Sequence, residues 1–175
     1  MKRIRFRRWL FNTWGKLPAR VRWVLTWLIL PKFLVGAVAV VFDSEGRVLL
    51  FRHTYRQRYP WGLPGGWLKN QESAIDAVER EIYEESGYEI RALYPLVIGG
   101  DPDQRRLDLI FLCELAGGEF RPSGEVEEAA FFLSESLPGQ VEPFHVKVVQ
   151  YAAEVLQEDR IRRSKVRSVQ KDVDV

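Results

Sequence analysis

The sequence predicts an α/β domain, and three observations support this prediction. Runs of aliphatic and β-branched residues, bounded by turn-forming residues, recur between residues 35 and 133 and are typical of strands. Residues 73–86 carry apolar side chains at helical spacing between a good N-cap and a good C-cap. A chain of 175 residues with 46% apolar content also suits one domain with a full core.

The N-terminal part of the chain differs in composition from the rest. Residues 1–42 contain nine basic residues and no acidic residue, so the remainder carries a net charge of −7. The nine are Lys2, Arg3, Arg5, Arg7, Arg8, Lys16, Arg20, Arg22 and Lys32. We expect residues 1–32 to form a basic, aromatic leader that is helical in parts and contains Trp9, Trp14, Trp23 and Trp27. The charge suits a phosphate backbone such as RNA, and the tryptophans suit an anionic membrane surface or a homodimer contact.

An apolar run at residues 23–42 resembles a signal peptide or a membrane span. Pro31 and Lys32 split the run into pieces shorter than the 20 or so apolar residues that cross a bilayer. Residues 34–42 are also needed as the first strand of the domain. The single cysteine, Cys113, lies in an apolar strand-like run and fits a reducing compartment. We therefore expect a cytoplasmic protein, peripheral to the membrane if the leader binds lipid.

The remaining elements follow in chain order. Strands are expected at residues 35–42, 47–51, 90–98, 107–115 and 128–133, and the first two form a hairpin. Turn-forming residues cluster at 99–103 and 117–124. Residues 141–156 are expected to form a closing helix. The compact domain then covers residues 33–157, and residues 158–175, which are highly charged and lack a core-facing pattern, form a disordered tail.

The helix at residues 73–86 has a defined start, a defined end and one acidic face. Ser73 and Asp76 fit a capping box, and Gly87 is a natural C-cap. Four apolar residues recur at helical spacing and form a buried stripe: Ala74, Ile75, Val78 and Ile82. Glu84 and Glu85 lie roughly 60° behind and 40° ahead of Glu81 around the helix axis. Three carboxylates therefore share one face within one turn.

Such a cluster has two interpretations. Most charge clusters are solvated helix faces, and this is the simpler alternative. The rigid, glycine-paired loop at residues 61–66 favours a metal site instead, because it brings bare backbone towards the start of the helix. Carboxylate and carbonyl oxygens are the ligands that a hard cation such as Mg²⁺ prefers.

Seven residues at fixed spacing then identify a family resemblance: Gly66, Glu72, Arg80, Glu81, Glu84, Glu85 and Gly87. They match G-x5-E-x7-R-E-U-x-E-E-x-G-U, where U is an aliphatic residue, and this is the defining box of the Nudix hydrolases. The resemblance covers roughly residues 33–138. It implies an α/β/α sandwich with a mixed β-sheet between helices, and a metal-dependent enzyme that hydrolyses a diphosphate linkage. Two residues depart from the family pattern: Tyr88 replaces an aliphatic residue, and Gln71 replaces a frequent glycine.

The resemblance also implies roles for individual residues. The carbonyl of Gly66 and the carboxylates of Glu81, Glu84 and Glu85 would bind Mg²⁺, or Mn²⁺ in its place. Arg80 would orient a carboxylate, and Glu72 would be a local partner within the box. Glu125 matches the place where several family members supply a further acidic ligand or base, and its alternative role is that of a surface loop residue. Either Glu81 or Glu125 would then be the general base.

The loop between the hairpin and the box mixes cations and aromatic residues. Arg56 and Arg58 are candidates to hold phosphates, and Tyr55 and Tyr59 are candidates to stack on a base or a sugar. The alternative is a solvated loop with Trp61 packed on the core. His53 and His145 have no spacing that suggests a metal site, so we expect them to be hydrogen-bonded structural residues.

The favoured substrate is ADP-ribose or a nucleotide sugar. Family members that hydrolyse ADP-ribose often carry a proline fifteen or sixteen residues after the last glycine of the box, and Pro102 is fifteen residues after Gly87. The tyrosine typical of dinucleoside-polyphosphate hydrolases is absent from residues 103–107. The alternatives are a (d)NTP pyrophosphohydrolase, an RNA 5′-end pyrophosphohydrolase and a non-catalytic nucleotide-binding domain. The intact acidic face argues against the last of these.

Overall fold

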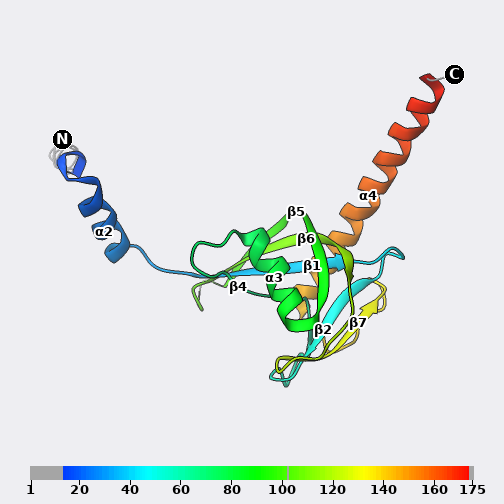
Figure 1. Cartoon of the computed structure of the whole chain (residues 1–175), viewed down its shortest axis with the longest axis horizontal. Coiled ribbons are helices and arrows are strands. Elements are labelled where there is room, and N and C mark those ends of the chain that lie inside the picture. Colours follow the sequence, from blue (N-terminus) through cyan, green and yellow to red (C-terminus); the bar gives the residue numbers. More distant parts are fainter. Residues whose placement is uncertain (1–13, 102, 174–175) are drawn as a thin grey trace. The chain divides into compact units, whose positions relative to one another are not determined.

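The computed structural model describes residues 14–101 and 103–173 (Figure 1). The chain forms two compact units, which divide between Phe33 and Leu34. The first unit contains α2 (Ala19–Ile29), which follows Pro18 and has no buried residue. Near its end, Nζ of Lys32 lies 4.4 Å from the ring centroid of Trp27. The first thirteen residues of the predicted leader lie outside the described part of the chain. Among the described residues, no helix combines the length and apolar character needed to cross a bilayer.

The second unit is built on one mixed β-sheet. The strands are β1 (Leu34–Phe42), β2 (Val48–His53), β3 (Trp61–Gly62), β4 (Gly65–Trp67), β5 (Tyr88–Asp101), β6 (Arg106–Gly118) and β7 (Val126–Phe132). They follow the order β3-β2-β1-β6-β5, with β4 paired to β1 and β7 paired to β2. β1 and β6 run parallel along their length, whereas the other strand pairs are antiparallel. The predicted hairpin is confirmed by the pairing of Phe42 with Val48.

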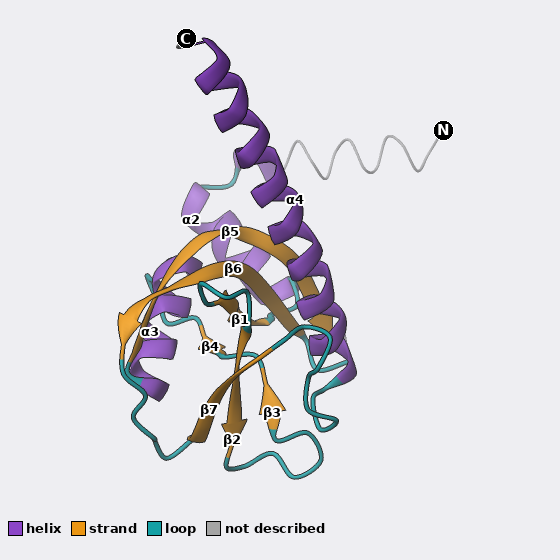
Figure 2. Ribbon diagram, turned by 90° about the vertical axis from the view of Figure 1, so that its right-hand side faces the viewer, coloured by secondary structure: helices purple, strands orange, loops and turns teal. Residues whose placement is uncertain are grey.

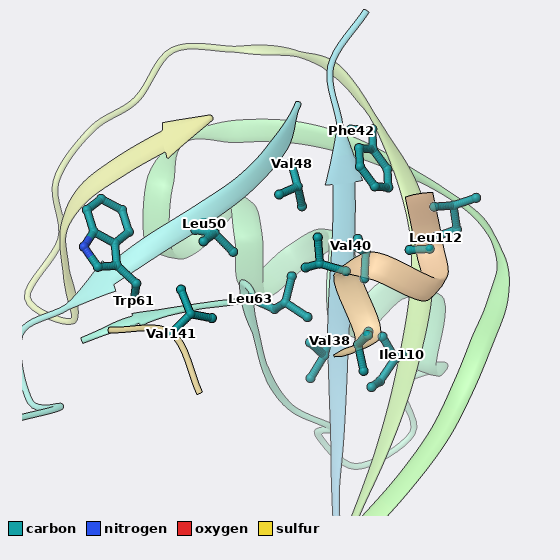
Figure 3. Packing of buried hydrophobic residues seen from close by; sticks show 13 residues of the cluster. Val38, Val40, Phe42, Val48, Leu50, Trp61, Leu63, Ile110, Leu112 and Val141 are labelled. Carbon is teal, nitrogen blue, oxygen red and sulfur yellow. The ribbon is translucent and has the colours of Figure 1, made fainter. Parts of the chain in front are cut away.

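Alternate residues of β1 pack on opposite sides of the sheet. Val38, Val40 and Phe42 join a cluster with residues of α4 (Pro143–Val173), and Figure 3 shows this cluster from close by. Ala37, Ala39 and Val41 join a second cluster with residues of α3 (Ala74–Ser86). The two helices therefore cover opposite faces of the sheet (Figure 2). This arrangement is the expected α/β/α sandwich, and it follows from the period-two side-chain alternation of a strand buried on both faces.

Both expected caps of α3 are present. The Ser73 hydroxyl accepts a hydrogen bond from the backbone N–H of Asp76, and Gly87 adopts the left-handed conformation with φ 74°. The predicted stripe is right for Val78 and Ile82, but Ile75 lies in the first turn and is 45% exposed. Ala77, one turn before Glu81, is buried in its place. The helix is further anchored by Oε1 of Glu79, which accepts a hydrogen bond of 2.9 Å from the N–H of Ala92 on β5.

The structure corrects the expected turn between β5 and β6. Gly99 and Gly100 belong to β5, where they pair with Asp108 and Leu107. The turn comes later, and Arg105 has a positive φ of 51° there. Likewise, β6 continues to Gly118, two residues into the predicted loop. In both places the backbone hydrogen bonds of a long antiparallel pair override the turn preference of glycine.

The C-terminal segment also differs from the expectation of a disordered tail. α4 continues to Val173 and does not end near Leu156. Residues 157–173 contain no glycine or proline and consist largely of Arg, Lys, Gln, Asp, Glu and Val. Arg, Lys, Gln and Glu are good helix formers, so local propensity is enough to extend a helix that has already begun on the core. The sequence argument relied on the high charge and the missing core-facing pattern, and it did not weigh helix propensity.

Candidate active site

The predicted box places Glu81 against the backbone of Gly66. Gly66 pairs with Ala37, so its position on β4 is set by the central strand β1. A Cβ atom at Gly66 would lie 2.4 Å from Cδ of Glu81, which is far inside contact distance. The missing side chain is therefore what allows the Glu81 carboxylate to approach this backbone.

Arg80 organises the acidic face. Its Nε donates to Oε1 of Glu72 at 2.6 Å, and its Nη1 donates to Glu81 at 2.7 Å and to Glu84 at 3.0 Å. Hydrogen bonds from Arg80 lower the pKa of Glu72 to about 2, with help from the N–H of Lys69. The same ion pairs raise the pKa of the Arg80 guanidinium. Arg80 thus faces carboxylates, and Nη2 also donates to the carbonyl of Trp67 at 3.3 Å.

The loop that brings Glu72 to Arg80 has an unusual backbone conformation. Gln71 has φ 64°, in the left-handed region that glycine adopts most easily. This is the position where the family often has glycine, so the departure seen in the sequence keeps the conformation at some cost in strain. Glu72 itself is held by the N–H of Lys69 at 3.1 Å.

Glu85 is the member of the acidic face that lacks a partner. The residue is 9% exposed, and its Oε2 has no hydrogen-bond partner within the described part of the chain. Burial raises the pKa of Glu85 to about 7, and the charges of Glu125 and Glu81 add to the shift. A buried carboxylate without a partner is unfavourable unless a cation or a hydrogen-bond donor compensates it.

These residues fit a hard divalent cation. Among the residues that the structure describes, no three Asp, Glu, His or Cys side chains are already grouped as metal ligands. Arg80 instead holds the carboxylates of Glu81 and Glu84, and Lys69 Nζ lies 3.4 Å from Glu84. The fit rests on the unpartnered oxygen of Glu85 and on the contact of Glu81 with the Gly66 backbone. Both offer the oxygen ligands that Mg²⁺ prefers.

Glu125 approaches the same face from the loop before β7. Its carbonyl accepts a hydrogen bond of 2.9 Å from the N–H of Thr54, and its own N–H donates to the Ser123 hydroxyl at 3.3 Å. The side chain is exposed, and after burial its charge is the largest influence on the pKa of Glu85. The sequence alternatives were a site acid and a surface residue, and the structure places Glu125 beside the acidic face.

A cavity of about 650 Å³ has both Gly66 and Glu125 in its lining. All four predicted substrate residues line it: Tyr55, Arg56, Arg58 and Tyr59. The guanidinium of Arg56 lies against the backbone of Gly62. A Cβ atom at Gly62 would lie only 2.4 Å from Nη1 of Arg56. Arg58 lies with Cζ 5.2 Å from the ring centroid of Tyr59. Trp61, by contrast, is a core residue that packs edge-on against Phe132.

Several cavity residues were not found from the sequence: Trp67, Gln104, Arg106, Glu142 and His145. Trp67 belongs to β4, Gln104 to the β5–β6 turn and Arg106 to β6. Glu142 directly precedes α4, and His145 lies in its first turn. No local motif marks them, because only the tertiary fold brings these segments together. Of these residues, only Trp67 could have been predicted from the sequence, because it directly follows Gly66 in the box.

The two histidines differ from each other. Nδ1 of His145 accepts a hydrogen bond of 3.3 Å from the N–H of Leu63, so it is the hydrogen-bonded structural residue that we expected. The same expectation is wrong for His53, whose two ring nitrogens are buried and have no hydrogen-bond partner in residues 14–101 and 103–173. Burial and the nearby charge of Arg56 lower the pKa of His53 to about 3 and that of His145 to about 4. Both rings are therefore neutral at pH 7, beside a cationic wall of the cavity.

Comparison with known proteins gives a consistent result. Residues 32–152 match the profile of the family described as NUDIX domain. The chain is 31% identical over 116 residues to an ADP-ribose pyrophosphatase of Methanocaldococcus jannaschii, covering 61% of this chain and 67% of that protein. It is 32% identical over 97 residues to an 8-oxo-dGDP phosphatase of Danio rerio, covering 55% of this chain and 29% of that protein. This chain thus spans less than a third of the length of the Danio rerio relative. A crystal structure of an ADP-ribose pyrophosphatase from Streptococcus suis superposes with a TM-score of 0.57 at 28% identity, covering 70% of this chain and 90% of that one.

The buried carboxylate of Glu85 leads to a prediction about how the stability of the protein depends on pH. The prediction applies to protein that EDTA keeps free of metal. Its pKa is raised from 4.5 to about 7, so between these pH values the folded state binds a proton that the unfolded state has lost. Stability therefore falls as pH rises through this window, and the full loss is present above pH 7. Glu85→Gln removes the charge and is expected to raise Tm at pH 8 by roughly 2–6 °C while leaving it unchanged at pH 4.

The matched control is Glu84→Gln. Burial alone would raise the pKa of Glu84, but hydrogen bonds from Arg80 and Lys69 lower it, so this change is not expected to stabilise the protein at pH 8. Added Mg²⁺ should raise Tm of the wild type more than that of Glu85→Gln. Calorimetry at the two pH values measures both effects. A lower Tm for Glu85→Gln at pH 8 in EDTA would contradict the unfavourable burial of this charge.

Proposed function

Because this chain belongs to the Nudix hydrolase family, we propose that it is a metal-dependent pyrophosphohydrolase acting on a nucleoside diphosphate derivative, with ADP-ribose or a nucleotide sugar favoured. The products would be a nucleoside monophosphate and a phosphorylated group. The observation that carries the proposal is an intact acidic face, with Glu81 packed on Gly66 and Glu85 unpartnered, beside a cavity lined by arginines.

In this proposal the acidic face holds the metal. Glu81, Glu84, Glu85 and the Gly66 carbonyl are the ligands, with Mg²⁺ as the natural ion and Mn²⁺ as a substitute. Such an ion neutralises diphosphate oxygens and lowers the pKa of an attacking water. Arg80 orients Glu81 and Glu84 through its Nη1, and Glu72 in turn holds Arg80.

A carboxylate must accept the proton of the attacking water, and two candidates remain from the sequence. Glu81 already accepts a hydrogen bond of 2.7 Å from Arg80 and packs on the Gly66 backbone, an arrangement that suits a ligand. The Glu125 side chain is exposed on the cavity wall. We therefore favour Glu125 as the general base and Glu81 as a ligand.

The cavity supports a substrate with a diphosphate between two bulky groups. Its volume of about 650 Å³ lies within the range of small-molecule sites. Arg56 and Arg58 offer forked donors to phosphate oxygens, and Tyr55 and Tyr59 offer flat rings. The position of Pro102 in the sequence and the relatives named as ADP-ribose pyrophosphatases favour the same substrate class.

Two alternatives have some support. The similarity to an 8-oxo-dGDP phosphatase favours a modified nucleoside diphosphate or triphosphate. The nine basic residues before Asp43 favour an RNA 5′ end. A non-catalytic nucleotide-binding domain is the third reading, and the complete set of box carboxylates argues against it.

We expect Glu84→Gln and Glu85→Gln each to lower kcat by about 10²-fold or more while the fold remains intact, because each change replaces a carboxylate ligand by a neutral amide and alters no apolar core side chain. Circular dichroism and thermal melting control for folding. Glu89→Gln, an exposed change just beyond the box helix, is the matched control and should leave kcat unchanged. Near-normal turnover in both variants, with Mg²⁺ still required, would exclude this acidic face as the metal site.

The substrate class is tested by steady-state kinetics with Mg²⁺ over ADP-ribose, several nucleotide sugars, (d)NTPs, 8-oxo-dGDP and a 5′-triphosphorylated RNA. We expect the highest kcat/KM for ADP-ribose or a nucleotide sugar. A value for any (d)NTP at least tenfold above that of every nucleotide sugar would refute the favoured class and support a role in the nucleotide pool. Hydrolysis of none of these compounds would favour the non-catalytic reading.

We propose that the leader binds an anionic membrane surface, so that the protein is cytoplasmic and peripheral to the membrane. α2 carries Trp23, Val24, Trp27 and Leu28 as exposed side chains, and no acidic residue precedes Asp43. Exposed tryptophans together with positive charge are typical of segments that lie in the membrane interface. A homodimer contact through the same tryptophans is the competing reading.

Deleting residues 1–20 removes seven of the nine basic residues. Each basic residue near an anionic surface contributes about 1 kcal/mol, so we expect at least roughly tenfold weaker binding to phosphatidylserine vesicles. Hydrolysis of small nucleotides should be preserved. Vesicle sedimentation measures the binding, with neutral phosphatidylcholine vesicles as the control, and light scattering reports the oligomeric state. Loss of all activity or of folding would instead make the segment part of the core or of a dimer interface.

A further inference from the structure

One wall of the cavity is built from three adjacent strands rather than from the predicted substrate loop. Trp67 on β4 pairs with Gly36 on β1, and Gly36 pairs with Asp108 on β6. The three residues therefore lie in one row across the sheet. Trp67 is 47% exposed, although it belongs to a strand and lines the cavity. A large aromatic side chain in such a position needs an explanation that core packing does not supply.

Arg106 completes this wall. Its Nε donates to Oδ1 of Asp108 at 2.8 Å, and its Cζ lies 5.1 Å from the ring centroid of Trp67. The guanidinium therefore reaches from β6 across β1 to the indole. Gly36 makes this possible, since a Cβ there would lie 2.4 Å from the Asp108 carboxylate that holds Arg106. Two flat groups, an indole and a guanidinium, thus lie next to each other in cation–π contact, and Asp108 holds the guanidinium.

The same wall is tied to the acidic face. Trp67 follows Gly66 directly, and the carbonyl of Trp67 accepts a hydrogen bond from Nη2 of Arg80 at 3.3 Å. The backbone of Trp67 is therefore held by the arginine that also bonds Glu81. A ligand group bound on the indole would have a fixed position relative to the proposed site of hydrolysis.

From this geometry we infer that Trp67 and Arg106 bind the nucleobase of the substrate by stacking, an inference that rests on the proposed function and adds a specificity site to it. Aromatic and guanidinium planes both stack on bases. A phosphate is the weaker candidate for this wall, because the carboxylate of Asp108 already offsets the charge of Arg106. Arg56 and Arg58, for which no carboxylate partner is found among the described residues, suit phosphate better.

Binding of two probes that resist hydrolysis tests the inference without requiring turnover. These are α,β-methylene-ADP, which has a base, and methylenediphosphonate, which has none, each titrated calorimetrically with Mg²⁺ present. Loss of a stacked base weakens binding by roughly 5- to 150-fold. We therefore expect Trp67→Ala to weaken α,β-methylene-ADP binding about tenfold or more and to leave methylenediphosphonate binding within twofold. Trp67→Phe should retain most of the affinity, and Arg106→Ala should lose part of it.

Each of the two alanine variants, Trp67→Ala and Arg106→Ala, has a control substitution of a similar side chain. Tyr151→Ala removes a similarly exposed aromatic side chain from α4, and Arg91→Ala removes an exposed arginine that is paired with Glu114, both away from the cavity lining. Neither should change the binding of either probe. In the kinetic assay, Trp67→Ala should raise KM for the best nucleotide substrate while kcat stays within about threefold.

Three results would overturn the inference. Equal affinity of the wild type for the two probes would mean that the base contributes nothing. Unchanged α,β-methylene-ADP binding by Trp67→Ala would exclude the indole. Equal weakening of both probes by Trp67→Ala would show that Trp67 supports the diphosphate site and not the base. Absence of hydrolysis in the wild type would count against the proposed function alone, since base-dependent binding is measured without it.

Discussion

The contact between Glu81 and the backbone of Gly66 is the constraint on which the candidate site depends. Gly66 is held by its pairing with β1, and β1 also pairs with β2 and β6 and packs against both helix layers. A side chain at Gly66 would collide with the Glu81 side chain and displace its carboxylate. The position of the Glu81 carboxylate, and of the Arg80 guanidinium that bonds to it, therefore depends on this one close approach.

The acidic face also shows a conflict between stability and function. Arg80 and Lys69 offset the charges of Glu72, Glu81 and Glu84, but Glu85 is buried with an unpartnered oxygen. A fold selected only for stability would place an apolar or amide side chain there. The two hydrophobic clusters that pack α3 and α4 on the sheet offset the unfavourable free energy of this buried charge. A bound cation would remove that unfavourable term.

The cavity differs in origin from the acidic face. One helix supplies most of the acidic face, whereas the cavity walls come from the loop 54–59, from β4, from the start of β6 and from the beginning of α4. Burial lowers the pKa of His145, and the charges of Arg56 from the loop and of Arg106 from β6 lower it further. Substitution of single residues in such a wall can change substrate specificity without disturbing α3. This property fits a family whose members act on different nucleotides.

The sequence by itself determined the helix, its caps and the identity of the acidic residues, because these depend on spacing within about twenty residues. The caps at Ser73 and Gly87 are local in the same sense, and the structure agrees with both of them. Only the tertiary structure decided which carboxylate is buried, since the periodicity that groups Glu81, Glu84 and Glu85 does not say which side the sheet occupies. It also decided that Gly99 and Gly100 belong to a strand, and that Trp67 meets Arg106 across Gly36. These outcomes depend on long-range strand pairing, and no short stretch of sequence encodes which distant segment will become its neighbour.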